Sequence, residues 1–296
     1  MTTATTASTR STASTASIAS AAERDTAAPE AGDDFAAAWR AWHDIHEADR
    51  ASAHGFLAIT AQHWLTAEPT RYDGMPGLWS TGEEGPVADL ADGESLLVDG
   101  ETVTGRAVFG PIPERGGRTA AVGDIVIEIA KRGGSDLLRP RHPGHPARTG
   151  YHGTPAYEPE RSWVIEGRFV PYDQPVEVTV GSVTEGLQHV YAAPGEVEFA
   201  HDGSLHRLIA FNGFAPGSLL VLFTDATSGV TTYPANRSLS VAAPGPDGRV
   251  VLDFTRAVNL PCAYTQFATC PLPPAGNRLP FAVEAGEQLP HAGSIR

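Results

Sequence analysis

Short runs of alternating apolar and polar residues, most of them ended by glycine turns, fill the chain between residues 87 and 254. In one of them Ile125, Ile127 and Ile129 fall on the same side of an extended strand. Aspartate–glycine pairs such as Asp202-Gly203 separate neighbouring runs, and this dipeptide is typical of tight hairpins. Helical segments do not alternate with the strands, which disfavours a parallel sheet with crossover helices. The pattern predicts a mainly β protein, an antiparallel barrel or sandwich.

One helix is predicted before the strands, over about residues 34–54. Phe35, Trp39, Trp42 and Ile45 recur there at helical spacing, so they form one apolar face that we expect to pack on a sheet. The run "GSLLVLFTD" is apolar on both faces, which predicts a central strand. We therefore expect one β-rich domain over residues 34–296, with this helix at its start.

The first 33 residues are rich in Ser, Thr and Ala and contain few large apolar side chains. Such a segment cannot offset its conformational entropy, so it is expected to be a disordered tail. It lacks the continuous apolar stretch of a secretory signal, and we expect a cytoplasmic protein.

The net charge of −14 and the absence of a Lys/Arg stripe argue against nucleic acid or an anionic membrane as a partner. No apolar run is long enough for a transmembrane helix. The expected partner is a small-molecule ligand or substrate, with anionic compounds included; the oligomeric state and any cofactor stay open.

Both cysteines lie in the proline-dense segment "PCAYTQFATCPLPPAGNRLPFAVEAGE", residues 261–287. Proline at this density excludes a helix or a central strand, so we expect a stiff, irregular wall of a ligand site. The seven residues between Cys262 and Cys270 do not match a zinc knuckle. Buried structural thiols are the favoured interpretation; a ligand-lining or reactive Cys262, a disulfide and a metal site are the alternatives.

Two histidine-containing segments have metal-ligand potential. In "WHDIHE", His43, His46 and Glu47 could present ligands on one helical face, although a solvated polar face is favoured. The loop "RPRHPGHPARTGYHG" could bind a metal or an anion, although a solvated loop whose arginines pair with surface acids is favoured. Its candidate residues are Arg139, Arg141, His142, His145, Arg148 and His152.

Polar residues that follow or lie in the later strands are the remaining candidates. Asp225 follows the predicted central strand, and Tyr233 and Arg237 are long enough to point back towards a barrel interior. Asp253 alternates with Leu252 and Phe254, so it is either a buried carboxylate that needs an arginine partner or a solvated one.

The segments "RVVLDFTRAVNLPCAYTQFATCPLPPAGNRLPFAVEAGE", "FTDATSGVTTYPANR" and "RPRHPGHPARTGYHGTPAYEPERSWVIEGRF" resemble domain-of-unknown-function family 1684 of bacteria and archaea. The resemblance covers about residues 120–290. Thr255 and Leu260 depart from the family's Asn and Pro, and Pro234-Ala235-Asn236 replaces its G-x-G. The resemblance implies a fold and a set of shared polar positions but no reaction. Those positions are Arg139, Arg141, Asp225, Thr227, Tyr233, Arg237, Asp253, Asn259, Cys262, Thr265, Cys270, Asn277 and Glu287.

Together these features predict a small-molecule site between the barrel mouth and the 259–287 segment. If the protein is an enzyme, we expect hydrolysis or proton transfer, with Asp253 or Asp225 as acid or base, Arg237 holding an anion and Cys262 lining the site. Tyr233, Asn259, Thr265, Cys270 and Asn277 complete the predicted ligand-binding set. A non-catalytic ligand-binding or accessory protein and a histidine-dependent metalloenzyme are the alternatives.

Overall fold

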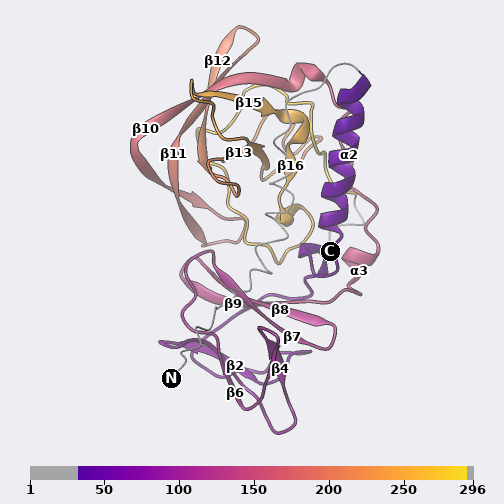
Figure 1. The fold of residues 1–296 in the computed structure, drawn as a ribbon, viewed down its shortest axis with the longest axis vertical. Helices are drawn as coiled ribbons and strands as arrows, with labels where there is room; N and C mark the ends of the chain where they lie inside the picture. Colours follow the sequence, from indigo (N-terminus) through magenta and orange to yellow (C-terminus); the bar gives the residue numbers. More distant parts are fainter. Residues whose placement is uncertain (1–32, 292–296) are drawn as a thin grey trace, which may run out of the picture.

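The computed structural model describes residues 33–291, which form sixteen strands in three antiparallel sheets. This confirms the predicted mainly β fold; the sheets do not close into a barrel. The expected disordered tail over residues 1–33 falls almost wholly outside the described residues. Figure 1 shows two lobes, with strands β1–β9 in the lower one and β10–β16 in the upper one.

The lower lobe holds a six-stranded sheet of order β1-β9-β8-β7-β4-β5 and a three-stranded sheet of order β2-β3-β6. Ile127 and Ile129 are fully buried against Trp79 between these elements, as their alternation predicts. The strands are β1 His63–Trp64, β2 Leu78–Gly82, β3 Gly85–Asp89, β4 Leu96–Val98, β5 Glu101–Val103, β6 Arg106–Val108, β7 Gly117–Val122, β8 Ile125–Arg132 and β9 Ser135–Arg141.

The upper lobe is built on a seven-stranded sheet of order β15-β10-β11-β12-β13-β14-β16. The predicted central strand is β13, which lies between β12 and β14 and is buried almost throughout. Its strands are β10 Val164–Gly181, β11 Gln188–His201, β12 Ser204–Asn212, β13 Leu219–Phe223, β14 Arg237–Val241, β15 Arg249–Asp253 and β16 Val258–Asn259.

The predicted hairpin at Asp202-Gly203 joins β11 to β12, where His201 pairs with Ser204. Both turn residues have positive φ, 47° for Asp202 and 74° for Gly203. This backbone matches the right-handed twist of the paired strands, and glycine adopts it without steric cost.

Helix α2, Asp33–Arg50, lies along the upper lobe (Figure 1). Phe35 and Trp39 are buried as predicted, and Trp39 Nε1 donates to the carbonyl of Thr255 at 2.7 Å. Ile45 is instead 42% exposed, so its assignment to the packing face is wrong. The buried face is rotated away from Ile45 and continues through His46 to Arg50, which is only 4% exposed.

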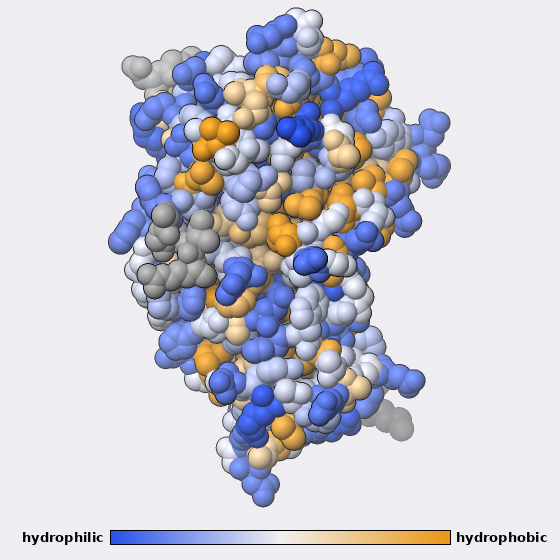
Figure 2. Space-filling view, turned by 180° about the vertical axis from the view of Figure 1, so that it is seen from behind, coloured by the Kyte–Doolittle hydropathy of each residue, from blue (hydrophilic) through white to orange (hydrophobic). Residues whose placement is uncertain are grey.

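Short helices and irregular segments complete the described chain. These are α3 Pro146–Thr149 and four 3-10 turns, η1 Phe56–Ala58, η2 Arg161–Trp163, η3 Phe254–Arg256 and η4 Pro261–Ala263. The proline-dense segment 261–287 is irregular, as its composition predicts. Within residues 33–291, every helix is too short or too polar to cross a membrane. In the space-filling view the wider upper half tapers towards the lower lobe, and apolar and polar side chains are interspersed (Figure 2).

Candidate functional site

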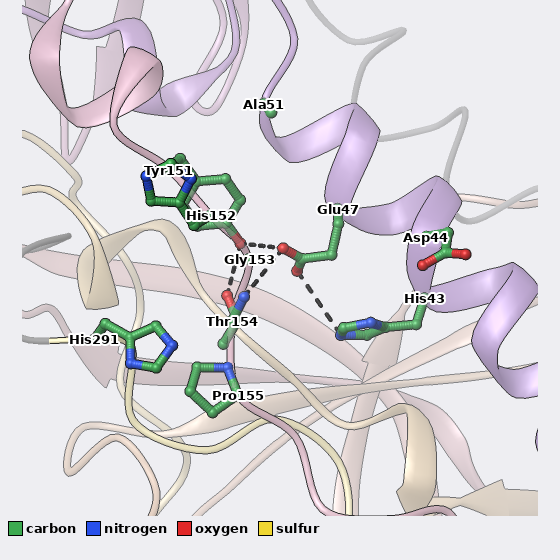
Figure 3. Close-up of a pocket in the computed structure, with 10 residues that line it drawn as sticks. All are labelled: His43, Asp44, Glu47, Ala51, Tyr151, His152, Gly153, Thr154, Pro155 and His291. Carbon is green, nitrogen blue, oxygen red and sulfur yellow. Dashed lines mark hydrogen bonds and ion pairs between the residues drawn. The ribbon is translucent and has the colours of Figure 1, made fainter.

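A cleft of about 560 Å³ opens between the second half of α2 and the loop 151–155 (Figure 3). Helix α2 contributes His43, Asp44 and Glu47 to one wall, and the loop forms the opposite wall. The full lining is His43, Asp44, Glu47, Ala51, Tyr151, His152, Gly153, Thr154, Pro155 and His291.

Glu47 is the best-anchored side chain of this cleft. Its Oε2 accepts hydrogen bonds from the Tyr151 hydroxyl at 2.5 Å and from the Thr154 backbone N–H at 3.1 Å. Its Oε1 accepts from Arg50 Nη1 at 2.6 Å. The carboxylate therefore joins the helix to the loop while its edge stays at the cleft wall.

Behind Glu47, Arg50 bridges to a second carboxylate at the far end of the chain. Arg50 Nη2 donates to Glu287 Oε1 at 2.7 Å, and both side chains are 2% exposed. Glu287 Oε2 accepts from the Asn259 backbone N–H at 2.7 Å and from the Tyr264 hydroxyl at 3.3 Å. Burial is the strongest single influence on Glu287 and opposes its ionisation, but the charge of Arg50, His46 and the hydrogen bonds from Asn259 and Arg50 together lower the pKa of this carboxyl.

The two histidines of α2 differ in their environment. His46 Nε2 lies 2.8 Å from Arg50 Nη2, and burial, aided by the Arg50 charge, lowers the pKa of His46 to about 4, so His46 is neutral at pH 7. The His43 ring stacks on Trp39 with centroids 4.7 Å apart. His43 Nε2 is buried, lies 3.9 Å from Glu47 Oε1, and has no hydrogen-bond partner among the described residues.

These groups form a cluster with unequal charges. Glu47 and Glu287 carry two negative charges, Arg50 carries one positive charge, and neutral His46 adds none, which leaves one negative charge beside His43. His43, Glu47 and Glu287 each place a ligand-type atom within 4.8 Å of the others. This arrangement can take up a proton or hold a cation at the cleft wall. The favoured prediction of a solvated polar face for His43, His46 and Glu47 is therefore wrong, because this face turns inward.

Of the predicted ligand-binding residues, Arg237 and Asn259 contact this cluster. Arg237 Nη1 donates to the Glu287 backbone carbonyl at 3.3 Å. The Asn259 backbone N–H donates to Glu287 Oε2, and its side-chain Nδ2 donates to the Gln288 carbonyl at 2.8 Å. Asn277 is fully buried elsewhere and binds the backbone of Ile209 and Leu222 across β12 and β13. Its side chain therefore links the neighbouring strands β12 and β13 by hydrogen bonds.

Asp225 and Arg237 form a separate buried ion pair at 2.8 Å. Arg237 also donates to the carbonyls of Val283 and Ala285, and Asp225 accepts from the Thr227 hydroxyl at 2.5 Å. Both side chains are at most 1% exposed, so neither presents a free group to a ligand in this structure. The pair ties the proline-dense segment to the upper sheet.

Asp253 lies at the end of β15, where it caps the short turn η3. Its Oδ1 accepts from the Thr255 N–H at 3.1 Å, and its Oδ2 lies 3.3 Å from Arg256 Nε. Burial raises its pKa, although the Thr255 hydrogen bonds and the Arg256 charge oppose this effect. The predicted arginine partner exists, yet Asp253 does not line the cleft.

Tyr233, Cys262 and Cys270 belong to one apolar cluster, and none of them lines the cleft. The Tyr233 hydroxyl donates to the Cys262 carbonyl at 2.8 Å. Both cysteines are buried free thiols in one apolar cluster. Thr265 is buried and its hydroxyl accepts from the Phe267 N–H at 3.2 Å.

The loop predicted to be solvated, with anion or metal binding as the alternative, has its arginines engaged inside the protein. Arg141 Nη2 donates to Glu128 Oε2 at 2.5 Å, and Arg139 Nη2 donates to Thr269 Oγ1 at 2.9 Å. Arg148 donates to the carbonyls of Ala51, Ser52 and Pro143. Of this loop's candidates, His152 alone lines the cleft.

Arg50, Tyr151 and Thr154 are members of the site that were not predicted from the sequence. A signal for Arg50 was present, because it follows His46 by four residues and His43 by seven on the same helical face. Tyr151 and Thr154 lie in a loop without periodicity, and only the fold brings them to Glu47.

Comparison with known proteins agrees with the resemblance in the C-terminal half. None of the curated proteins matches the chain. The solution NMR structure of an uncharacterized protein from Haloarcula marismortui is similar at 28% identity and a TM-score of 0.40, over 48% of this chain and 78% of that one. Residues 149–288 match the family described as "Protein of unknown function (DUF1684)", which is the family that the motifs of this segment resemble.

Proposed function

We propose that the protein binds a small molecule in the cleft beside α2 and that His43 exchanges a proton with this ligand. The observation that carries the proposal is the pairing of His43 with Glu47 at the wall of a cleft of about 560 Å³. This volume is within the roughly 300–1,000 Å³ of small-molecule sites. The reaction class is hydrolysis or another proton transfer, as the sequence predicts, but with His43 in place of Asp253 or Asp225.

The charges around His43 support this role. The excess negative charge of Glu47 and Glu287 over Arg50 can balance the positive charge that an imidazole gains when it accepts a proton. Stacking on Trp39 holds the ring in place, which removes part of the entropic cost of positioning an acid–base group.

The lining also suggests which ligands fit. Asp44, Glu47 and three histidines line the cleft, and its lining contains neither arginine nor lysine. Arg50 lies behind Glu47 with both terminal nitrogens already bonded to protein groups. Neutral or cationic ligands with hydrogen-bond donors are therefore favoured over the anionic ones that the sequence suggested.

Binding can be tested with a variant that fills the cleft. Ala51, directly after α2, lines the cleft, whereas Ala48 is exposed within α2, so Ala51→Phe and Ala48→Phe are compared as a pair. Ligand-observed NMR with a library of polar metabolites should find compounds that bind the unmodified protein and Ala48→Phe but not Ala51→Phe. If no compound separates the two variants, the cleft is not a ligand site.

Turnover is tested on the compounds found in this way. Proton NMR in D₂O reports both hydrolysis and exchange of carbon-bound hydrogen. We expect His43→Asn to slow the reaction by about 10²–10⁴-fold with affinity changed only a few fold. Binding without any turnover would instead support the non-catalytic alternative.

A metal-dependent reaction at the same cleft is the second candidate. It is favoured by the unpartnered, buried His43 Nε2, which faces Glu47 and Glu287 within 4.8 Å. One imidazole and two carboxylates suit Zn²⁺. Arg50 donates one hydrogen bond to Oε1 of Glu47 and one to Oε1 of Glu287, so each of these oxygens keeps a lone pair for a metal ion. Calorimetric titration with ZnCl₂ should then show one bound ion per chain, lost in His43→Asn and kept in His142→Asn. Absence of Zn²⁺ binding would reject this candidate.

A further inference from the structure

The two cysteines of the chain share one buried apolar cluster in the proline-dense segment. Cys262 is 8% exposed and Cys270 is 7% exposed, and both pack with Ala268. The backbone N–H of Cys262 donates to Cys270 Sγ at 3.4 Å. The Cys270 sulfur therefore lies against Cys262 within the folded protein, so the two cysteines are neighbours without any unfolding of the segment.

The backbone on both sides of this contact is held by side chains and strands of the upper lobe. The Cys262 carbonyl accepts from the Tyr233 hydroxyl at 2.8 Å. The Cys270 carbonyl accepts from the Val183 N–H at 3.0 Å and the Ser182 hydroxyl at 3.1 Å. Because a disulfide requires two Cα atoms at a narrow range of separations, two cysteines in contact on anchored backbones favour its formation.

The two thiols also differ in acidity. The hydrogen bond from Cys270 lowers the pKa of Cys262. The same hydrogen bond, together with burial, raises the pKa of Cys270 well above its usual value. Since the thiolate is the nucleophile, Cys262 is the group that meets an oxidant first and Cys270 is the group that resolves the product.

We propose that Cys262 and Cys270 are an oxidation site at which hydrogen peroxide forms an intramolecular disulfide. The Cys262 thiolate attacks one peroxide oxygen, the O–O bond breaks, and the departing hydroxide takes up a proton and leaves as water. The Cys270 thiol then attacks the sulfur of the Cys262 sulfenic acid, the S–S bond forms, and a second water leaves. In total, two thiols and one peroxide give one disulfide and two waters.

This inference does not depend on the proposed function, because neither cysteine lines the cleft beside α2. In the cytoplasm that the sequence predicts, both thiols are expected to stay reduced until peroxide rises. The proline-dense segment then changes covalently in response to the redox state of its surroundings.

The full-length protein can be treated with stoichiometric hydrogen peroxide, unfolded and alkylated with iodoacetamide. We expect neither cysteine to be alkylated, a mass loss of two hydrogen atoms, and a cross-linked peptide that dithiothreitol separates. The Cys270→Ser variant should stop at a sulfenic acid on Cys262 that dimedone traps. Thiols that stay alkylatable, a disulfide between two chains, or oxidation to sulfinic acid without a disulfide would overturn the proposal.

Thermal unfolding of the wild-type protein gives a second measurement that needs no variant. Closing the loop from Cys262 to Cys270 in an unstrained geometry should raise the Tm by about 5–10 °C. A lower Tm after oxidation would show that the backbone does not fit the bond, and would contradict the preformed geometry.

Discussion

Replacement of Arg50 by methionine should remove the hydrogen bonds and the ion pair that connect the end of α2 to the loop 151–155 and to Glu287. Arg50 Nη1 donates to Glu47, Tyr151 and Thr154, and Nη2 donates to Glu287 and His46. Methionine fills a similar volume but offers none of these donors. The Glu287 side chain is only 2% exposed, so in this variant its carboxylate stays buried and has lost its cationic partner.

The expected loss is about 3–5 kcal/mol in the free energy of unfolding at pH 7, the usual cost of leaving a buried charge unpaired. Arg40 provides the matched control because it lies on the same helix with a side chain that is 62% exposed and only weakly paired, at 4.0 Å from Glu158. Arg40→Met should change the free energy of unfolding by no more than about 0.5 kcal/mol.

The pH dependence has a defined sign. In the wild-type protein the pKa of Glu287 is lowered, so its ionisation stabilises the fold above its ordinary pKa of about 4.3, and this contribution is lost as the pH falls through the lowered value. In Arg50→Met, burial raises the pKa of Glu287 above its value in the unfolded chain. The folded protein then holds this proton more tightly than the unfolded chain does, so the free energy of unfolding falls as the pH rises above about 4.3. The destabilisation in Arg50→Met should therefore shrink on going from pH 7 to pH 5, by up to about 1.4 kcal/mol per pH unit.

Urea unfolding followed by tryptophan fluorescence measures this loss, because Trp39 and Trp42 lie on α2. Adding Glu287→Gln to Arg50→Met removes the unpaired charge and should abolish most of the extra pH dependence. A loss below about 1 kcal/mol, or the same loss at pH 5 and pH 7, would refute the assignment of Arg50 as the partner that keeps Glu287 ionised.

Three further substitutions test individual assignments. Gly286→Ala should lower the free energy of unfolding by at least about 3 kcal/mol, since Gly286 has φ +73° and a Cβ there would overlap the Ala257 carbonyl. Gly276→Ala, at a site with open space, is the control, and equal thermal unfolding curves for the two variants would contradict this expectation. Asn277→Ala should lower the free energy of unfolding in urea by about 2–4 kcal/mol, because it leaves buried backbone groups of β12 and β13 unpaired. An unchanged midpoint would show that Asn277 does not stabilise the contact between these strands. Asp253→Asn should not change the affinity of the cleft for its ligand, as measured by NMR titration. A loss of binding would show that Asp253 contributes to the ligand site.

The sheets could be predicted because their signals are local. Alternation in β8, the aspartate–glycine turn before β12 and the apolar run of β13 each lie within a few residues, and each is found as expected. The buried face of α2 was misplaced towards Ile45, because the periodicity weighs apolar side chains and ignores a buried arginine. The motifs of the C-terminal half correctly indicated the family over residues 149–288.

The sequence by itself determined the antiparallel β class and the irregular proline-dense segment, since turn chemistry and proline geometry act over short distances. Only the tertiary structure decided where the polar groups meet. It joins Arg50 to Glu287 across 237 residues of chain, and it places Asp225, Asp253 and Asn277 outside the lining of the cleft beside α2, each with its own partners. The reason is physical: a charged side chain can be buried only where the fold supplies its partner, and that partner carries no signal in the local sequence.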